Sequence, residues 1–357
     1  GHKVSREFYI NDAGVQIEKV ILSLVVRVKQ ELGRPAEIPE GGYHGQYLVE
    51  LAQALLRERP GLASAAEAEL LAACRAAPDL IRREQEELLR DLRVVFEVWS
   101  SEQAIRDAGK VEAAVALLAK RGLTYEQDGA LFLRTTNLGD DKDRVLRKSD
   151  GSFTYFLPDI AYHIDKHERG FDRVIDVWGA DHHGYIPRVR AVLKALGYGD
   201  EYFEVALVQL VKVVKEGEEV RMSKRSGEFV TLRELLEWVG VDATRYFFLM
   251  RPGHSPFTFD VDLARKQTDE NPIFYVQMAH ARMSGIFRVA GRTPESASGV
   301  VALDALVAAE DMELLKKLAV FPDALAKAAR VREPHRITDY LEDLARVAHG
   351  WYHKCRV

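Results

Sequence analysis

Residues 173–214 read RVIDVWGADHHGYIPRVRAVLKALGYGDEYFEVALVQLVKVV, and this stretch decides the fold class. Its apolar spacing predicts a strand over residues 173–180, a helix over 186–196 and a second strand over 203–214, where the apolar run is nearly continuous. Strands that alternate with helices in this way form parallel sheets covered by helices. The stretch therefore predicts an α/β fold with a doubly wound, Rossmann-like sheet.

The residues on the N-terminal side extend the same fold. Their apolar and β-branched patterns predict a strand over 4–10, a helix over 15–32 and another strand over 92–99. A strongly helical segment lies between these strands, and short alternating runs typical of antiparallel strands follow them. We interpret residues 1–250 as one nucleotide-binding domain with insertions over about 33–92 and 103–153.

The pattern changes beyond residue 250. Beyond residues 251–253 only helices are predicted, over 271–290, 302–329 and from 335 onward, and residues 251–270 are interpreted as a connector. We expect an all-helical domain over 271–357 that is incomplete at its C-terminal end. Because the chain opens in a strand-like run without an initiating Met and stops within a helical pattern, we interpret it as a fragment.

Composition excludes several classes of protein. The chain has 357 residues, of which 47% are hydrophobic and 29% charged, so it is long enough for two or three domains. Neither a signal peptide nor a membrane span is recognisable, and a cytoplasmic monomer is expected. Cys74 and Cys355 are too far apart in sequence to indicate a disulfide framework or a zinc knuckle. The net charge of −5 argues against non-specific coating of nucleic acid but allows a local basic face for RNA.

The run WGADHHGY at 178–185 joins a predicted strand to a helix, where open parallel sheets bind ligands. Gly179 would let a ribose approach closely, Asp181 can accept hydrogen bonds from its hydroxyl groups, and His182 can pack on or hydrogen-bond a substrate. One alternative is a turn in which Asp181 caps the next helix. A His-Asp-His metal site is a weaker alternative, because a turn with this spacing offers no defined ligand face. We therefore expect no metal ligands from the protein.

A second candidate is the cationic loop Arg221-Met222-Ser223-Lys224 and the residues up to Gly227. It follows the last predicted strand and precedes a helix that opens with Thr231 and Glu234, the pattern of a capping box. A small, Gly-flanked cationic loop beside a nucleotide crevice suits a mobile clamp for triphosphate charge. The alternative is a solvated basic loop.

This loop resembles the Lys-Met-Ser-Lys loop of class I aminoacyl-tRNA synthetases, with Arg in the first place. The resemblance implies catalytic roles for Arg221, Ser223 and Lys224, and ATP contacts for Met222 and Lys224. Within that class, five stretches resemble bacterial-type arginyl-tRNA synthetases in the family's order. They are REFYINDAGVQ at 6–16, TYFLPDIAYHIDK at 154–166, WGADHHGY at 178–185, residues 222–245, and NPIFYVQMAHAR at 271–282.

The resemblance implies ATP-dependent activation of arginine to arginyl-adenylate and its transfer to the 3′ end of tRNA(Arg), with ATP and Mg²⁺ as cofactors. It also implies a class I catalytic domain over 1–250, and over 271–357 part of an anticodon-binding bundle. Gly179, Asp181 and His182 would then bind the adenosine of ATP.

Four residues would hold the arginine by the same resemblance: Tyr155, Asp159, Glu102 and His182. Asp159 would pair with the guanidinium, which a carboxylate accepts through two hydrogen bonds. Its alternative role is the N-cap of a helix over 160–167. Glu102 resembles a family carboxylate near the substrate amino group, and its alternative role is that of an acid in the first turn of a helix. His163 and His167 are interpreted as structural.

Possible contacts with tRNA are assigned to Asn11, Asp12, Gln16 and Arg282. The residues of the first three predict only a turn and the start of a helix, and Arg282 equally suits helix packing.

The sequence departs from the family at one place. The His-x-Gly-His element that receives ATP phosphates is absent, and the family match places it upstream of Gly1. This leaves the alternative of a non-catalytic tRNA-binding or interaction fragment. Another class Ia synthetase, such as the cysteine enzyme, is disfavoured by the lack of zinc-ligand cysteines and by the run from Tyr155 to Asp159.

Overall fold

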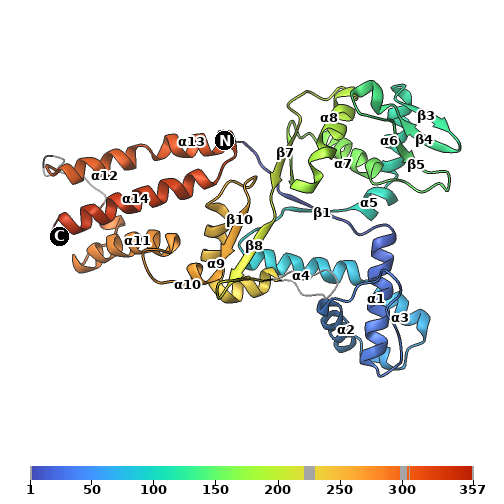
Figure 1. Ribbon diagram of the computed structural model, residues 1–357, viewed down its shortest axis with the longest axis horizontal. Helices are drawn as coiled ribbons and strands as arrows, with labels where there is room; N and C mark the ends of the chain where they lie inside the picture. The colour runs from blue at the N-terminus through green and yellow to red at the C-terminus, as the bar shows by residue number, and fades with distance from the viewer. Residues whose placement is uncertain (1, 221–229, 298–303, 305, 356–357) are drawn as a thin grey trace. The chain divides into compact units, whose positions relative to one another are not determined.

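The computed structural model describes residues 2–220, 230–297, 304 and 306–355 (Figure 1). Its described residues form two compact units, one extending to Val208 and the other beginning at Gln209. The predicted domain boundary at residue 250 lies inside the second unit and remains a prediction. Among the described residues, no helix is long and apolar enough to cross a membrane.

Two pairs of parallel strands lie at the centre of the first unit. β1 (Glu7–Ile10) pairs with β2 (Val98–Ser101), and β6 (Val174–Gly179) pairs with β7 (Phe203–Val208). Between β6 and β7 the chain passes through η3 (Ala180–Tyr185) and α8 (Ile186–Ala195). Strand, helix and parallel strand follow one another as predicted, which confirms the α/β class. Among the described residues, however, the two ladders are separate two-stranded pairs.

Helix α7 (Phe156–Glu168) occupies the core of this unit and packs against α5 (Glu102–Asp107), α6 (Lys110–Lys120) and α8. Its apolar residues, including Leu157 and Ile160, are fully buried. Burial of each such side chain stabilises the fold by about 1.5–3 kcal/mol. Every residue from 156 to 166 is buried except Asp159. Asp159 is therefore the point at which this buried segment reaches the surface.

The two insertions have their own structure. The elements of the first are α2 (Gln46–Glu58), η1 (Pro60–Ser64), α3 (Glu67–Cys74) and α4 (Ala77–Asp91). They share a separate apolar core with α1 (Val15–Glu31), the helix that precedes the insertion. The second contains the antiparallel strands β3 (Thr124–Gln127), β4 (Ala130–Leu133) and β5 (Arg144–Arg147), with η2 (Thr135–Leu138) between the last two. The antiparallel strands predicted there are therefore confirmed.

The strand predicted over 92–99 begins later than expected, at Val98. Arg93 has a positive φ of 59°, and the N–H groups of Arg93 and Val94 donate to carbonyl groups in the last turn of α4. The first residues of the predicted strand thus terminate the helix instead. The short strand β2 then matches the length of its partner β1.

The second unit combines a small sheet with helices. β8 (Val211–Lys215) lies between β9 (Glu218–Glu219) and β10 (Phe257–Asp260). The helices and the short 3-10 turn that complete it are α9 (Leu232–Leu249), α10 (Val261–Arg265), α11 (Pro272–Val289), η4 (Glu295–Ala297), α12 (Ala309–Ala319), α13 (Phe321–Val331) and α14 (His335–Lys354). Among the described elements of the C-terminal region, α14 packs against α11, α12 and α13.

Three predictions for this region are wrong. The single strand over 203–214 is two strands, β7 and β8, which pair with β6 and β10 respectively. The region after residue 253 does not contain helices only, since β10 pairs in parallel with β8 and buries Phe259. The helix over 302–329 is divided within its described part, because Pro322 stands in the first turn of α13 and proline favours a helix start.

Candidate functional site

The first turn of α7 carries the central candidate, Asp159. The helix begins at Phe156 with Tyr155 as its N-cap, so Asp159 lies inside the first turn and is not the cap. The N-cap alternative is therefore wrong. A carboxylate in the first turn is stabilised by the positive end of the helix dipole.

The Asp159 carboxylate is only partly satisfied. Its side chain is 26% exposed, yet its Oδ2 atom is buried and, among the described residues, has no hydrogen-bond partner. Burial, the largest cause, raises the pKa of this carboxyl; the charge of His163 opposes the effect and that of Asp176 adds to it. A buried acceptor without a donor costs about 1–3 kcal/mol, and more when it is charged. The site is thus prepared for a ligand that brings donors.

Two tyrosines influenced by Asp159 were not predicted from the sequence. Burial raises the pKa of Tyr185, and Asp159 raises it further. Burial, followed by the charges of Glu102 and Asp159, likewise raises the pKa of Tyr9. Both phenols keep their protons at neutral pH and can donate hydrogen bonds. Tyr9 belongs to the motif at 6–16 and Tyr185 to the motif at 178–185. Neither was selected from the sequence, because a tyrosine beside apolar residues is usually interpreted as part of the core.

Tyr155 and Glu102 differ from Asp159 in their surroundings. Tyr155 is 75% exposed, so it does not line a closed pocket. Glu102 is buried and is the first residue of α5, with its Oε1 atom 2.5 Å from Nη2 of Arg106. Glu102 therefore occupies the position of an acid in the first turn of a helix, which is the alternative role predicted for it. The predicted roles of both residues in binding arginine remain predictions.

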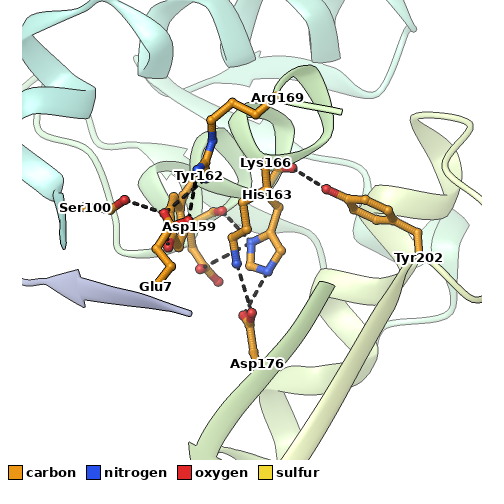
Figure 2. A network of polar contacts seen from close by, with 9 residues as sticks. All are labelled: Glu7, Ser100, Asp159, Tyr162, His163, Lys166, Arg169, Asp176 and Tyr202. Atoms are coloured by element: carbon orange, nitrogen blue, oxygen red, sulfur yellow. Dashed lines mark hydrogen bonds and ion pairs between the residues drawn. The ribbon is translucent and has the colours of Figure 1, made fainter. Parts of the chain in front are cut away.

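A buried polar network lies behind Asp159 (Figure 2). Asp176 on β6 accepts hydrogen bonds from His163 Nε2 and Lys166 Nζ, each at 2.9 Å. Burial alone would raise the pKa of Asp176, but His163 and Lys166 outweigh it and lower the pKa to about 2. His163 Nδ1 lies 2.8 Å from the backbone oxygen of Asp159. The network therefore joins the first turn of α7 to the strand that leads to the candidate nucleotide turn.

A second set of contacts joins α7 to the first strand pair (Figure 2). Glu7 on β1 accepts hydrogen bonds from Arg169 at 2.9 and 3.0 Å, from the Tyr162 hydroxyl at 2.7 Å, and from Ser100. Burial tends to raise the pKa of Glu7, but these donors and the charge of Arg169 lower it overall. This set was not predicted from the sequence, because its members are far apart along the chain.

The turn after β6 places Gly179, Asp181 and His182 together. The side chains of Asp181 and His182 are 83% and 60% exposed. A Cβ atom added to Gly179 would lie only 2.7 Å from Asp181 Oδ1. The N-cap residue of α8 is Tyr185, and no side chain among the described residues forms a capping hydrogen bond there. The alternative in which Asp181 caps the next helix is therefore wrong. The absence of a side chain at Gly179 leaves space for the Asp181 carboxylate, which is exposed and can accept hydrogen bonds from ribose hydroxyls.

The predicted tRNA residues of the first unit already have internal contacts. Asp12 Oδ1 accepts a hydrogen bond of 2.9 Å from the backbone N–H of Gln103, which lies in the first turn of α5. Gln16 accepts one of 3.0 Å from the Tyr43 hydroxyl, and Asn11 is exposed. Asn11 and Gln16 are exposed, whereas Asp12 is half-buried.

Arg282 joins two helices of the second unit. Its Nη1 atom lies 2.6 Å from Nδ1 of His349, and its guanidinium lies over the Tyr352 ring at 5.5 Å. Both partners belong to α14, so these contacts fit the helix-packing alternative. Contact with tRNA at this residue remains a prediction.

The cationic loop is not part of the described structure. Arg221, Met222, Ser223 and Lys224 lie outside the described residues. The capping box that follows the loop is confirmed: Thr231 Oγ1 accepts from the Glu234 N–H at 3.1 Å, and Glu234 accepts from the Thr231 N–H at 2.8 Å.

No group of three His, Cys, Asp or Glu side chains within the described ranges is placed to hold a metal ion. His163 takes part in the network above, and His167 stacks on Tyr198 with ring centroids 4.0 Å apart.

Comparison with family models gives two matches. Residues 65–246 match "tRNA synthetases class I (R), catalytic domain", and residues 276–357 match "DALR anticodon binding domain".

Curated relatives and solved structures agree with these matches. The arginine–tRNA ligases of Geobacillus kaustophilus and Geobacillus thermodenitrificans are each 50% identical over the whole chain. The chain spans about 65% of the length of these curated relatives. A Campylobacter jejuni crystal structure described as an arginyl-tRNA synthetase superposes with a TM-score of 0.90 at 32% identity, covering all of this chain and 78% of that one. The Thermus thermophilus arginyl-tRNA synthetase shares the fold, with a TM-score of 0.74 at 22% identity over 99% of this chain and 68% of its own.

Proposed function

The chain belongs to the class I arginyl-tRNA synthetase family, and from this we propose that it provides the arginine and adenosine sites for charging tRNA(Arg). The single observation that carries the proposal is the Asp159 carboxylate, whose Oδ2 atom is buried without a donor from the described residues.

A guanidinium matches this carboxylate better than other cationic groups do. Its planar array of N–H donors pairs with both oxygens of a carboxylate, whereas the ammonium of lysine is a point charge. An analogue that leaves a buried polar group unpaired is rejected by up to about 10⁴-fold. Tyr185 hydrogen-bonds Asp159 and Tyr9 hydrogen-bonds Glu102, so the two phenols hold carboxylates of the proposed site.

The turn after β6 suits the adenosine of ATP. Gly179 has no side chain and so leaves room for the Asp181 carboxylate. Asp181 offers this exposed carboxylate to the ribose hydroxyls, and His182 provides a ring for packing. Mg²⁺ would arrive with the phosphates of ATP, and Lys224 would meet the charge that develops on them. In the reaction, a carboxylate oxygen of arginine attacks the α-phosphorus and pyrophosphate leaves. A hydroxyl of the terminal tRNA ribose then attacks the arginyl carbonyl carbon, and AMP leaves.

Binding of tRNA(Arg) is proposed for the second unit. The match of residues 276–357 to an anticodon-binding domain supports this, together with the packing of α11, α12 and α13 against α14.

Calorimetric titration of the chain with arginine, lysine and canavanine tests the proposal. We expect arginine to bind in preference to lysine, and Asp159→Asn to weaken arginine binding by about 30-fold or more, since loss of one partner of a buried charge pair costs about 2–5 kcal/mol. Asp172→Asn removes the same charge from an exposed position and should leave binding unchanged. Equal binding of arginine and lysine would refute the assignment. Binding of tRNA without binding of arginine would favour a non-catalytic tRNA-binding chain.

A further inference from the structure

His163 lies between two groups that only accept hydrogen bonds. Its Nδ1 atom is 2.8 Å from the backbone oxygen of Asp159, and its Nε2 atom is 2.9 Å from Oδ2 of Asp176 (Figure 2). A backbone carbonyl has no proton to give, and Asp176 is ionised at neutral pH because its pKa is lowered to about 2. Only a ring with a proton on each nitrogen can donate to both groups, and such a ring is an imidazolium.

This positive charge is buried and faces the arginine-site carboxylate. The side chain of His163 has no exposed surface, and its Nδ1 atom lies 3.6 Å from Oδ1 of Asp159. Water cannot screen a charge in such a position as it screens one at the surface. The imidazolium therefore acts directly on Asp159.

The other groups around His163 come from three elements. Those on α7 and β6 that titrate or carry charge are Asp159, Tyr162, Lys166 and Asp176. Phe203 on β7 packs nearly perpendicular to the His163 ring, with ring centroids 4.9 Å apart. Tyr202, the residue before β7, is a neutral phenol whose hydroxyl donates to the backbone oxygen of His163.

The charges in this cluster balance only when the ring is protonated. Asp159 and Asp176 are two carboxylates, and the ammonium of Lys166 lies 2.9 Å from Asp176 and balances one of them. A neutral ring would leave the second negative charge buried without a counterion, and a buried carboxylate in that situation takes up a proton. A protonated carboxyl group no longer offers two acceptors to a guanidinium.

We propose that His163 is a positioning residue, an imidazolium that keeps the Asp159 carboxylate ionised and oriented before a guanidinium arrives. This inference rests on the proposed role of Asp159. The hydrogen bond to the Asp159 backbone orients the first turn of α7, and the charge sets the ionisation of the side chain.

The test is arginine binding as a function of pH. Calorimetry is run between about pH 6 and pH 8.5 on the 357-residue chain and on His163→Gln, which keeps a hydrogen-bonding side chain but cannot carry a charge. The wild-type affinity should change less than about threefold over this range, whereas the affinity of His163→Gln should fall by about tenfold or more from pH 8.5 to pH 6. The fall comes from protonation of Asp159, so the same pH series on Asp159→Asn should show no such fall.

A purely structural role would give a different result. If His163→Gln weakened binding by the same factor at every pH, or had no effect, the inference would be overturned. Failure of the proposed function is distinguishable from this: Asp159→Asn would then bind arginine as well as the wild type, whatever His163→Gln does.

A second measurement does not depend on the folding of the variant. Histidine-labelled wild-type chain is examined by ¹H–¹⁵N correlation at pH 7, and the His163 ring is assigned through its contacts with the Phe203 ring. Both ring nitrogens should show the shifts of protonated imidazolium nitrogens. A single protonated nitrogen would contradict the inference.

Discussion

Glu7 on β1 and Arg169, the residue that follows α7, are joined by two hydrogen bonds of 2.9 and 3.0 Å between one carboxylate and one guanidinium. The Glu7 side chain is 11% exposed, so the pair is shielded from solvent on the carboxylate side. It fixes the end of α7 to the first strand pair while Asp159 at the other end of the helix remains available.

Removal of one partner of this pair should destabilise the first unit. Glu7→Gln removes a carboxylate that accepts from Arg169, Tyr162 and Ser100 and leaves Asp165 as the remaining partner of Arg169. We expect a loss of about 1–3 kcal/mol in the free energy of unfolding, measured by urea denaturation. Glu201→Gln removes one partner of an exposed ion pair with Arg173 and should change stability by less than about 1 kcal/mol. Equal effects of the two variants would contradict a stabilising role for the Glu7 pair.

Asp176 should make the free energy of unfolding depend on pH in the acidic range. Its pKa is lowered from the ordinary value of 3.8 to about 2, so the stability that it contributes is present above pH 4 and is lost as pH falls through its folded pKa. The amount is about 2 kcal/mol. Unfolding free energies measured between pH 2 and pH 5 should therefore fall less steeply in Asp176→Asn than in the wild type. Parallel curves would show that Asp176 has an ordinary pKa in the folded chain.

Asp159 should have the opposite effect. Because its pKa is raised in the folded chain, it binds its proton more tightly when folded, and its contribution to stability decreases as pH rises through that pKa. Asp159→Asn should thus raise the melting temperature of the ligand-free chain at pH 7 by roughly 2–4 °C, corresponding to about 1 kcal/mol, although it impairs arginine binding. The gain should shrink on acidification to pH 4. A lower melting temperature at pH 7 would show that the carboxylate stabilises the fold.

Gly179 should matter for nucleotide binding and little for folding. Its φ of −64° and ψ of 151° are open to any residue, but an added Cβ would lie 2.7 Å from Asp181 Oδ1 and displace that carboxylate. We expect Gly179→Ala to weaken binding of ATP roughly tenfold in a fluorescence titration, the effect of one lost charge-assisted hydrogen bond. Gly61→Ala, where the added atom meets open space, is the matched control. Unchanged ATP affinity would remove Asp181 from the proposed site.

Lys224 should act on the rate of activation. We expect Lys224→Ala to lower pyrophosphate exchange by roughly 10²-fold or more, measured with tRNA present in a background that contains the full catalytic domain. Lys212→Ala removes an exposed lysine on β8 and serves as control. An undiminished exchange rate in Lys224→Ala would rule out the clamp role.

Much of the fold was predictable because the relevant signals are local. Helix α7, the capping box of Thr231 and Glu234, and the antiparallel insertion each depend on spacings of a few residues, and all three are present. The pairing of strands was less predictable. The apolar run over 203–214 reads as one strand, but its halves pair with β6 and β10, and the choice of partner depends on residues far away in sequence.

The α/β class, the candidate acceptor Asp159 and the ordered motifs of the family all follow from the order of residues along the chain. The groups that surround Asp159 are seen only in the folded molecule: the protonated Tyr9 and Tyr185, and the network of His163, Lys166 and Asp176. The reason is physical. A motif specifies residue types along the chain, whereas burial and charge at Asp159 arise from β1, η3 and β6, which folding brings to the first turn of α7.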